Sequence, residues 1–274
     1  MFMSMPNNLV LVRHGESEGN VATRAGKAGN LDIFTDEFRE RPGHDWRLTP
    51  TGVEQARITG LWIARFILDN GNAAFERFYV SPHRRTRETA GHLALMNAHW
   101  LKVPRLRERD WGDIESMSRQ EYAEKYPDNA RKKRIDSLYW RPPGGESIAQ
   151  VSETRVQRFF DTLHREASGQ SVIAVTHGEF IWATRFELER MGHEEWAVSE
   201  SDAAQKIKNC QVVQYSRVDP ESGSQSSKVL WVRSVCPWET PDSPGVWIEL
   251  ERNGYTNEEL LEEVERVPRL NLPE

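Results

Sequence analysis

Three short apolar runs in the chain each end abruptly at polar residues. Leu9–Val12 precedes Arg13-His14-Gly15, Phe78–Ser81 precedes Pro82-His83-Arg84-Arg85, and Val172–Thr176 precedes His177-Gly178. Runs of about five residues rich in β-branched and aromatic side chains are typical of strands buried on both faces. We therefore expect three core strands, each followed directly by side chains that can carry chemistry.

Apolar residues at helical spacing lie between these strands. One pattern runs from Pro50 to about Asn70, a second follows Pro82 and reaches Met96, a third spans about Ser147 to Arg165, and a fourth begins after Gly178. Strands that alternate with helices of this length predict a largely parallel sheet covered by helices. Ligands of open α/β sheets bind at the carboxyl ends of the strands, where the three polar segments are expected to meet.

The pattern changes after Ala203. Lys206–Arg217 and Ser227–Val235 alternate, and they predict antiparallel strands joined by the turn-rich residues 219–223. Beyond Pro237 the chain is rich in Pro, Asp and Glu, and Thr256-Asn257-Glu258-Glu259 has capping-box spacing that predicts a short terminal helix.

Composition excludes several classes of protein. The chain has 274 residues, 38% hydrophobic and 28% charged, with a net charge of −6, so a nucleic-acid partner is not expected. No apolar run of roughly 18 residues and no secretory signal is visible, so no membrane partner is expected. Two cysteines, Cys210 and Cys236, in a chain of this length fit free thiols and a cytoplasmic location.

The polar segments contain the groups that an enzyme needs to bind and attack a phosphomonoester without a metal. Arg13 and Arg85 can hold phosphate oxygens, because a planar guanidinium meets them bidentately. His14 can attack phosphorus as a neutral imidazole if its other ring nitrogen is fixed as a donor. His177 can donate to phosphoryl oxygens in the transition state. Glu108 is a candidate acid, with a pKa expected to rise beside a phosphate and Trp111.

Other residues carry weaker signals. We expect His83 at the rim rather than in the chemistry, and no zinc cluster has suitable spacing. The basic run Arg131–Arg134 is expected to be a solvated helix face, with a rim that binds a second anionic group as the alternative. Trp46, Trp111 and Trp140 are candidates for an apolar substrate pocket.

Five ordered blocks resemble the histidine phosphatase superfamily, the phosphoglycerate-mutase-like group, over roughly residues 8 to 216. The blocks are Arg13-His14-Gly15-Glu16-Ser17 with Asn20, Leu48-Thr49 with Gly52 and Gln55-Ala56, Ser81-Pro82 with Arg85 and Thr89-Ala90, Glu108 with Gly112, and Pro143–Ser147 with Thr176-His177-Gly178. The resemblance implies a three-layer α/β/α sandwich with a mostly parallel sheet and a phosphohistidine intermediate at His14. It also implies a phosphate pocket of Arg13, Asn20, Arg85 and His177, Glu108 as proton donor, and no cofactor or metal.

Two departures from the mutase branch favour hydrolysis. Residues 21–47 form a longer insertion that lacks the branch's Phe-Thr-Gly-Trp-like stretch, and only about thirty residues separate Gly112 from Pro142. Residues 131–147 look more like the broad-specificity phosphatase branch. The expected function is a metal-independent phosphomonoesterase acting on a small phosphorylated substrate. A mutase and a weakly catalytic module that binds a phosphorylated ligand stay as alternatives.

The resemblance also divides the chain. Residues 1–216 are expected to form the catalytic domain, with the insertion 21–47 as a candidate lid. Residues 217–274 are expected to be a strand-and-tail extension that packs on the same domain. The tail beyond Pro237 leaves homodimer formation open.

Overall fold

The structure, a computed structural model, describes residues 4–68, 74–251 and 254–271. The strands are β1 (Asn8–Arg13), β2 (Arg77–Val80), β3 (Trp100–Lys102), β4 (Ser171–Thr176), β5 (Val212–Ser216), β6 (Trp231–Val235) and β7 (Ile248–Glu249). The α-helices are α1 (Glu18–Lys27), α2 (Asp36–Glu40), α3 (Pro50–Ile63), α4 (Arg84–His92), α5 (Arg119–Lys125), α6 (Pro127–Ile135), α7 (Ile148–Val151), α8 (Gln157–Glu166), α9 (Gly178–Leu188), α10 (His193–Ser201) and α11 (Asn257–Glu265). Short 3-10 or π turns are η1 (Gly43–Asp45), η2 (Ala64–Leu68), η3 (Pro104–Leu106), η4 (Gly112–Ile114), η5 (Ser152–Val156) and η6 (Ala203–Gln205).

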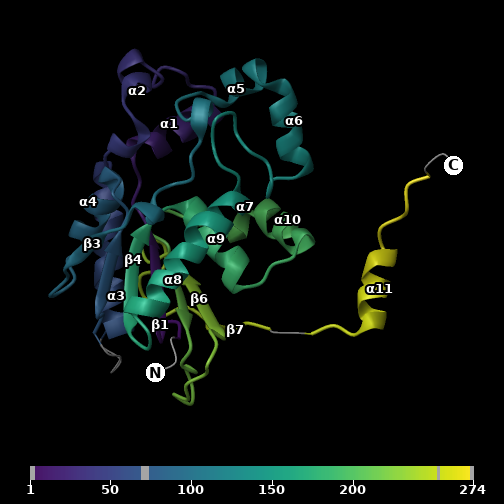
Figure 1. Ribbon diagram of the computed structural model, residues 1–274. Coiled ribbons are helices and arrows are strands. Elements are labelled where there is room, and N and C mark those ends of the chain that lie inside the picture. The colour runs from purple at the N-terminus through teal and green to yellow at the C-terminus, as the bar shows by residue number, and fades with distance from the viewer. Residues whose placement is uncertain (1–3, 69–73, 252–253, 272–274) are drawn as a thin grey trace.

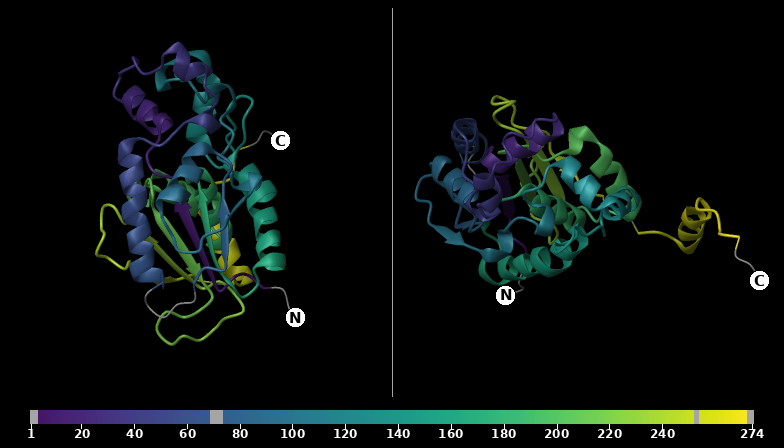
Figure 2. Two further views of the ribbon diagram at one scale, coloured as in Figure 1. Left: turned by 90° about the vertical axis from the view of Figure 1, so that its left-hand side faces the viewer. Right: turned by 90° about the horizontal axis from the view of Figure 1, so that it is seen from above.

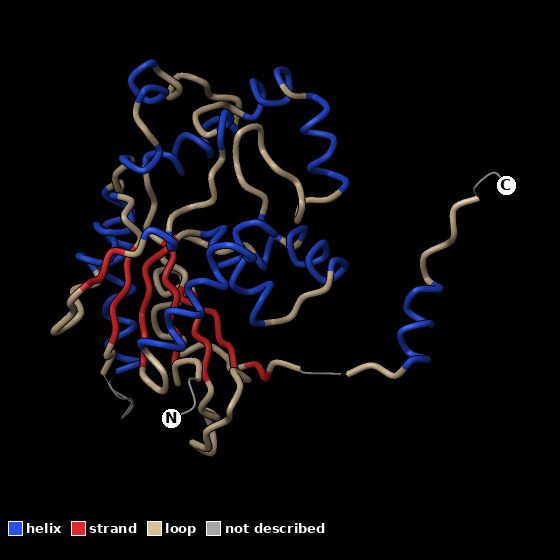
Figure 3. Tube along the Cα trace, viewed as in Figure 1, coloured by secondary structure: helices blue, strands red, loops and turns tan. Residues whose placement is uncertain are grey.

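Among the described residues, one mixed sheet has the strand order β3-β2-β4-β1-β5-β6-β7 (Figure 3). Strands β3, β2, β4 and β1 pair in parallel, and β5, β6 and β7 extend the sheet by antiparallel pairs. The parallel half contains all three strands predicted from the apolar runs. The β5–β6 pair confirms the predicted antiparallel strands, although both are shorter than the alternating segments in the sequence.

Alternate side chains of the central strands pack on opposite faces of the sheet. Leu9 and Leu11 of β1 belong to the apolar cluster that includes α8 and α9, whereas Val10 and Val12 belong to the cluster that includes α3. The views from the front and the side show helices on both faces of the sheet (Figures 1 and 2). The three-layer α/β/α sandwich is therefore confirmed, and burial on both faces explains why these strands are continuously apolar.

The predicted helices are present with different boundaries. The first consists of α3 followed by the π turn η2, and its predicted end at Asn70 lies outside the described residues. The second ends at His92 instead of reaching Met96, because Ala94 has a left-handed φ of 50° that a continuing helix cannot contain. The third is α7 and α8 joined by the π turn η5, and the fourth is α9.

The carboxyl-terminal segment begins on the sheet and ends away from it. Strand β7 pairs with β6, and the Leu250 amide donates to the Leu230 carbonyl at 2.7 Å. Helix α11 begins at the predicted capping box of Thr256 and Glu259, but it has no buried residue. It stands clear of the rest of the molecule on the side of α6 and α10 (Figures 1 and 2).

Two further expectations concern the thiols and the helices. Cys210 and Cys236 are both free, as predicted, and burial raises the pKa of each thiol to about 12. Among the described residues, every helix is too short or too polar to traverse a lipid bilayer.

Candidate active site

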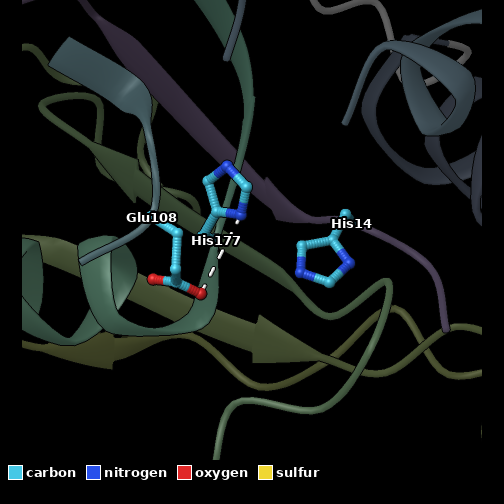
Figure 4. Close-up of side chains that lie close together, drawn as sticks. All are labelled: His14, Glu108 and His177. Carbon is cyan, nitrogen blue, oxygen red and sulfur yellow. Dashed lines mark ion pairs between the residues drawn. The ribbon is translucent and has the colours of Figure 1, made fainter. Parts of the chain in front are cut away.

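The sheet brings the three predicted polar segments together at one edge. His14 follows β1, His177 follows β4 and caps α9, and Arg85 lies in the first turn of α4, which follows β2. Strands β1 and β4 are neighbours in register, with Arg13 opposite Thr176. The His14 and His177 rings consequently lie 5.2 Å apart between centroids, and Glu108 approaches them from a third segment (Figure 4).

The imidazole of His14 is held in one tautomer. Its Nδ1 lies 2.7 Å from the carbonyl oxygen of Gly15, which can only accept, so Nδ1 carries the hydrogen. The lone pair of Nε2 then points to Arg85, whose Nε donates to it at 3.1 Å. Burial lowers the pKa of His14 well below 6.5, and the positive charges of Arg85 and Arg13 lower it further. His14 is therefore a neutral imidazole whose nucleophilic lone pair on Nε2 accepts a hydrogen bond from Arg85.

Close backbone packing fixes the segment that carries His14. A Cβ atom at Gly15 would lie 2.4 Å from the carbonyl oxygen of Gly52, a distance that no side chain tolerates. The Gly15 amide donates to Thr89 Oγ1 at 3.0 Å, and the Glu16 amide donates to Gln55 Oε1 at 2.8 Å. Glycine at position 15 thus allows the nucleophile's backbone to lie directly against α3.

Arg85 lies between the two imidazoles. Its Nη2 is 3.2 Å from Nδ1 of His177, and its Nη1 donates to the Gly43 carbonyl at 2.6 Å. Only 5% of its surface is exposed. The guanidinium therefore points its donors into the space between His14 and His177, where an anion would bind.

Arg13 and Asn20 line the same cavity. Arg13 Nη1 donates to the Ile207 carbonyl at 2.6 Å, and its buried Nε has no hydrogen-bond partner among the described residues. Asn20 Oδ1 accepts from the Ser17 amide at 3.1 Å and from Asn209 Nδ2 at 2.9 Å. Within the described part of the chain, Asn20 Nδ2 makes no hydrogen bond, so it can donate into the cavity.

Glu108 lies on the loop between η3 and η4, with Oε2 3.9 Å from Nδ1 of His177. Burial raises its pKa above 4.5, and the negative charge of Glu179 raises it further, while Arg85 opposes the shift. The pKa of Glu108 is thus shifted in the predicted direction, with burial as the largest cause. Arg155, on the π turn η5, donates to the carbonyl oxygens of Arg107 at 2.6 Å and Glu108 at 3.4 Å, which holds this loop.

His14, Glu108 and His177 also form a group of potential metal ligands, with donor atoms within 4.8 Å of one another. Arg85 disfavours a cation there, because its guanidinium already contacts both imidazoles and would repel the charge at short range. The same position suits an anion.

A cavity of about 1370 Å³ is lined by His14, Arg85 and Glu108, but not by the fully buried His177, and it extends to the helices above the sheet. Its wall comes from α1, which continues into the insertion 21–47, and from α5, α6 and α10. These helices lie above or beside the carboxyl ends of the strands (Figure 1). Trp46 and Trp111 line it, as the sequence suggests, but Trp140 does not. Trp140 is buried, and Lys133 Nζ lies 4.5 Å from its ring centroid.

The basic run of α6 is divided between cavity and solvent. Lys133 and Arg134 line the cavity, whereas Arg131 and Lys132 are exposed and do not. Burial lowers the pKa of Lys133. The solvated face and the cavity rim are thus both present on one helix, and binding of a second anionic group there stays a prediction.

Sequence reasoning missed several polar contacts of the site. Ser81 Oγ lies 2.8 Å from Nε2 of His177, and Asn209 joins Asn20 to the His14 carbonyl. Ser81 was part of a recognised block, so its place after β2 was a usable signal, whereas nothing in the sequence marks Asn209. His83 stacks edge-on against His177 at 4.8 Å and does not line the cavity, so the expected rim position stays a prediction.

Comparisons with known proteins agree with this architecture. The chain is 31% identical over 70% of its length to a 2,3-bisphosphoglycerate-dependent phosphoglycerate mutase of Parvibaculum lavamentivorans, covering 84% of that protein. It is 31% identical over 59% of its length to the phosphoglycerate mutase-like protein AT74 of Arabidopsis thaliana, and the match spans 48% of that relative, about half.

Two solved structures share the fold. The mycobacterial glucosyl-3-phosphoglycerate phosphatase in complex with VO3 gives a TM-score of 0.59 at 22% identity, covering 77% of this chain and 92% of that one. An alpha-ribazole-5'-P phosphatase candidate from Escherichia coli gives a TM-score of 0.59 at 19% identity. The match covers 82% of this chain and 96% of that one. The model of the histidine phosphatase superfamily (branch 1) matches residues 9–215. The chain therefore belongs to the histidine phosphatase superfamily.

Proposed function

We propose that this protein is a metal-independent phosphomonoesterase that hydrolyses a small phosphorylated substrate through a phosphohistidine at His14. One observation carries the proposal. The Nε2 lone pair of a neutral, buried His14 points toward Arg85, whose donors reach both imidazoles and which makes no ion pair with a carboxylate among the described residues. Such a site is built for an anion that a nucleophile attacks, and phosphorus in a monoester dianion meets that description.

The first half of the reaction forms the phosphohistidine. Arg13, Asn20, Arg85 and His177 would bind the phosphoryl oxygens. His14 Nε2 then forms a bond to phosphorus while the bond from phosphorus to the leaving oxygen breaks. Glu108 gives its proton to that oxygen, and the leaving group departs as an alcohol.

The second half returns the enzyme to its starting state. A water molecule attacks the phosphohistidine and gives its proton to Glu108, and the bond between phosphorus and His14 Nε2 breaks. Inorganic phosphate is released. Glu108 suits both halves because burial and Glu179 raise its pKa, which keeps the protonated form available over a wider range of pH.

A mutase is the second candidate, and relatives named as phosphoglycerate mutases favour it. A mutase must retain the phosphoryl group on histidine until an acceptor binds and must resist water. The longer insertion 21–47, which lacks the mutase branch's Phe-Thr-Gly-Trp-like stretch, and the short segment between Gly112 and Pro142 favour hydrolysis. Incubation with 3-phosphoglycerate separates the two: release of phosphate identifies a phosphatase, and formation of 2-phosphoglycerate identifies a mutase.

The deciding experiment is a screen over a panel of phosphomonoesters in buffer treated with a chelator. We expect the wild type to release phosphate from at least one ester and the His14→Ala variant to release none above background. Full activity of His14→Ala, or loss of wild-type activity on chelation, would contradict the proposal. Wild-type turnover at background on every ester would instead favour a module that only binds a phosphorylated ligand.

A further inference from the structure

Ser81 makes a direct contact with a proposed catalytic residue. It follows β2, is fully buried, and places Oγ 2.8 Å from Nε2 of His177. The His83 amide donates to the same Oγ at 3.4 Å, and Thr86 Oγ1 donates to the Ser81 carbonyl at 2.9 Å. The first turn of α4 therefore fixes the position of this hydroxyl, while its hydrogen stays free to rotate.

Without substrate, the surroundings of His177 select one tautomer. Arg85 Nη2 lies 3.2 Å from Nδ1, and because a guanidinium only donates, Nδ1 must hold a lone pair. Burial and the charge of Arg85 lower the pKa of His177 well below 6.5, so the ring is neutral. Its single hydrogen is then on Nε2, and Nε2 donates to Ser81 Oγ.

With a phosphoryl group in place, the requirement on His177 is reversed. Its Nδ1 faces the space that Glu108 and His14 border, with Glu108 Oε2 at 3.9 Å. An unprotonated phosphoryl oxygen only accepts, so Nδ1 must carry the hydrogen to bind it. Nε2 of the neutral ring then holds the lone pair and needs a donor. A hydroxyl group can serve either tautomer, because it both donates and accepts.

We propose that Ser81 is a positioning residue whose hydroxyl reverses its hydrogen bond to His177 Nε2 when a phosphoryl group replaces Arg85 at Nδ1. The hydroxyl accepts from Nε2–H in the free protein and donates to Nε2 in the occupied site. The change moves one proton from Nε2 to Nδ1 of the same ring by exchange with water and leaves the net charge unaltered. The inference rests on the proposed function in one respect, namely that His177 contacts the phosphoryl group.

Nitrogen-15 NMR of the uniformly labelled full-length protein tests the reversal, because the two neutral tautomers and the imidazolium ion have distinct ring-nitrogen shifts. Inorganic phosphate serves as the probe, so no turnover is needed. We expect His177 in the Nε2–H form without phosphate and in the Nδ1–H form at saturation. Retention of the Nε2–H form, or conversion to imidazolium, would overturn the proposal.

Two variants extend the test. Ser81→Thr keeps a hydroxyl, and we expect it to keep the phosphate-induced tautomer change and kcat within about threefold of wild type. Ser81→Ala leaves Nε2 without its partner, and we expect loss of the tautomer change and a fall in kcat of about ten- to a hundredfold, with a smaller effect on KM. Wild-type kcat and a normal tautomer change in Ser81→Ala would overturn the proposal.

Failure of this inference is distinguishable from failure of the proposed function. If His14→Ala were fully active, the phosphohistidine reaction would be wrong, yet the NMR titration of His177 with phosphate would still report on Ser81. If His14 proved essential while the His177 tautomer never changed, the proposed role of Ser81 would be wrong and the proposed function would stand.

Discussion

Arg85 Nε donates a hydrogen bond to His14 Nε2 across 3.1 Å. The donor occupies the line along which the nucleophilic lone pair points, so the guanidinium marks the place where the phosphoryl group would lie. Substrate must displace it by a short distance and then bind to it. Burial lowers the pKa of His14, and the charge of Arg85 lowers it further, so the imidazole is neutral before substrate arrives.

Replacement of Arg85 by lysine tests whether phosphoryl binding needs a planar guanidinium at this position. Lysine keeps the positive charge but cannot contact two acceptors in one plane, so Arg85→Lys should lower kcat/KM by about a hundredfold or more. The neighbouring Arg84→Lys is the matched control, because Arg84 is exposed and pairs with Asp45 instead of the site. A hydrolytic rate that is equally insensitive to both substitutions would contradict the assignment of Arg85.

The pH profile tests Glu108 as the proton donor. The low pKa of His14 keeps the nucleophile neutral well below pH 6.5, and the raised pKa of Glu108 keeps the acid protonated above its usual 4.5. The kcat/KM of the wild type should therefore peak on the acid side and fall as Glu108 ionises. In Glu108→Gln the rate should fall steeply for esters with poor leaving groups, and the alkaline limb should vanish. An unchanged alkaline limb would assign that ionisation to another group.

Acid should destabilise the fold through buried imidazoles. His83 has its pKa lowered to about 3 by burial, with Arg85, His44, Arg107 and Arg155 adding positive charge around it. Between pH 6.5 and about 3 the unfolded chain binds more protons at His83 than the folded chain does. The contribution of His83 to the free energy of unfolding is therefore complete above pH 6.5 and is lost as the pH falls. The lowered pKa values of His14 and His177 also make the fold less stable in acid. The raised pKa of Glu108 has the opposite effect on the free energy of unfolding.

Substitution of His83 isolates one part of that effect. His83→Gln should reduce the loss of unfolding free energy between about pH 7 and about pH 5, measured by urea denaturation. The exposed His99→Gln is the control and should leave the difference between the two pH values as in wild type. If His83→Gln lost as much stability as wild type over this range, its imidazole would not be held neutral in the fold.

The carboxyl-terminal helix should be dispensable for the fold. Because α11 has no buried residue, deletion of residues 252–274 should change the free energy of unfolding by no more than about 0.5 kcal/mol. Deletion after Val235 should instead be severe. It removes β7 together with Leu250, which packs on the core, and Trp238, whose indole donates to the Asn209 carbonyl at 2.8 Å. A large loss of stability in the shorter deletion would show that α11 has a partner.

The sequence was most informative where strands end. His14, Arg85 and His177 follow three consecutive apolar runs, and the geometry of parallel sheets places such residues at one edge whatever the loops between them do. Glu108 was a candidate acid from its own segment, and the resemblance supported it, but strand ends could not place it because Arg155 holds its loop. Helix starts also agreed well, since capping residues such as Thr256 act locally.

The remaining features depend on tertiary contacts that a local pattern does not record. The helix after Pro82 ends four residues before Met96 because Ala94 adopts a left-handed φ, which alanine rarely does. The π turn that aims Arg155 at the Glu108 loop has no sequence signature. Trp140 was expected in the cavity, but it packs beneath Lys133. The contact of Ser81 with His177 emerges only when β2 and β4 lie side by side.

Rapid-quench mass spectrometry tests the central claim most directly. The protein is mixed with a phosphomonoester that it hydrolyses. The reaction is quenched in alkali within the first turnover to preserve phosphohistidine, and the protein is then digested for peptide mapping. We predict a transient phosphoryl adduct on the peptide that contains His14, absent from His14→Ala and longer-lived in Glu108→Gln. Steady turnover with no adduct at His14, or an adduct on another residue that persists in His14→Ala, would contradict the account.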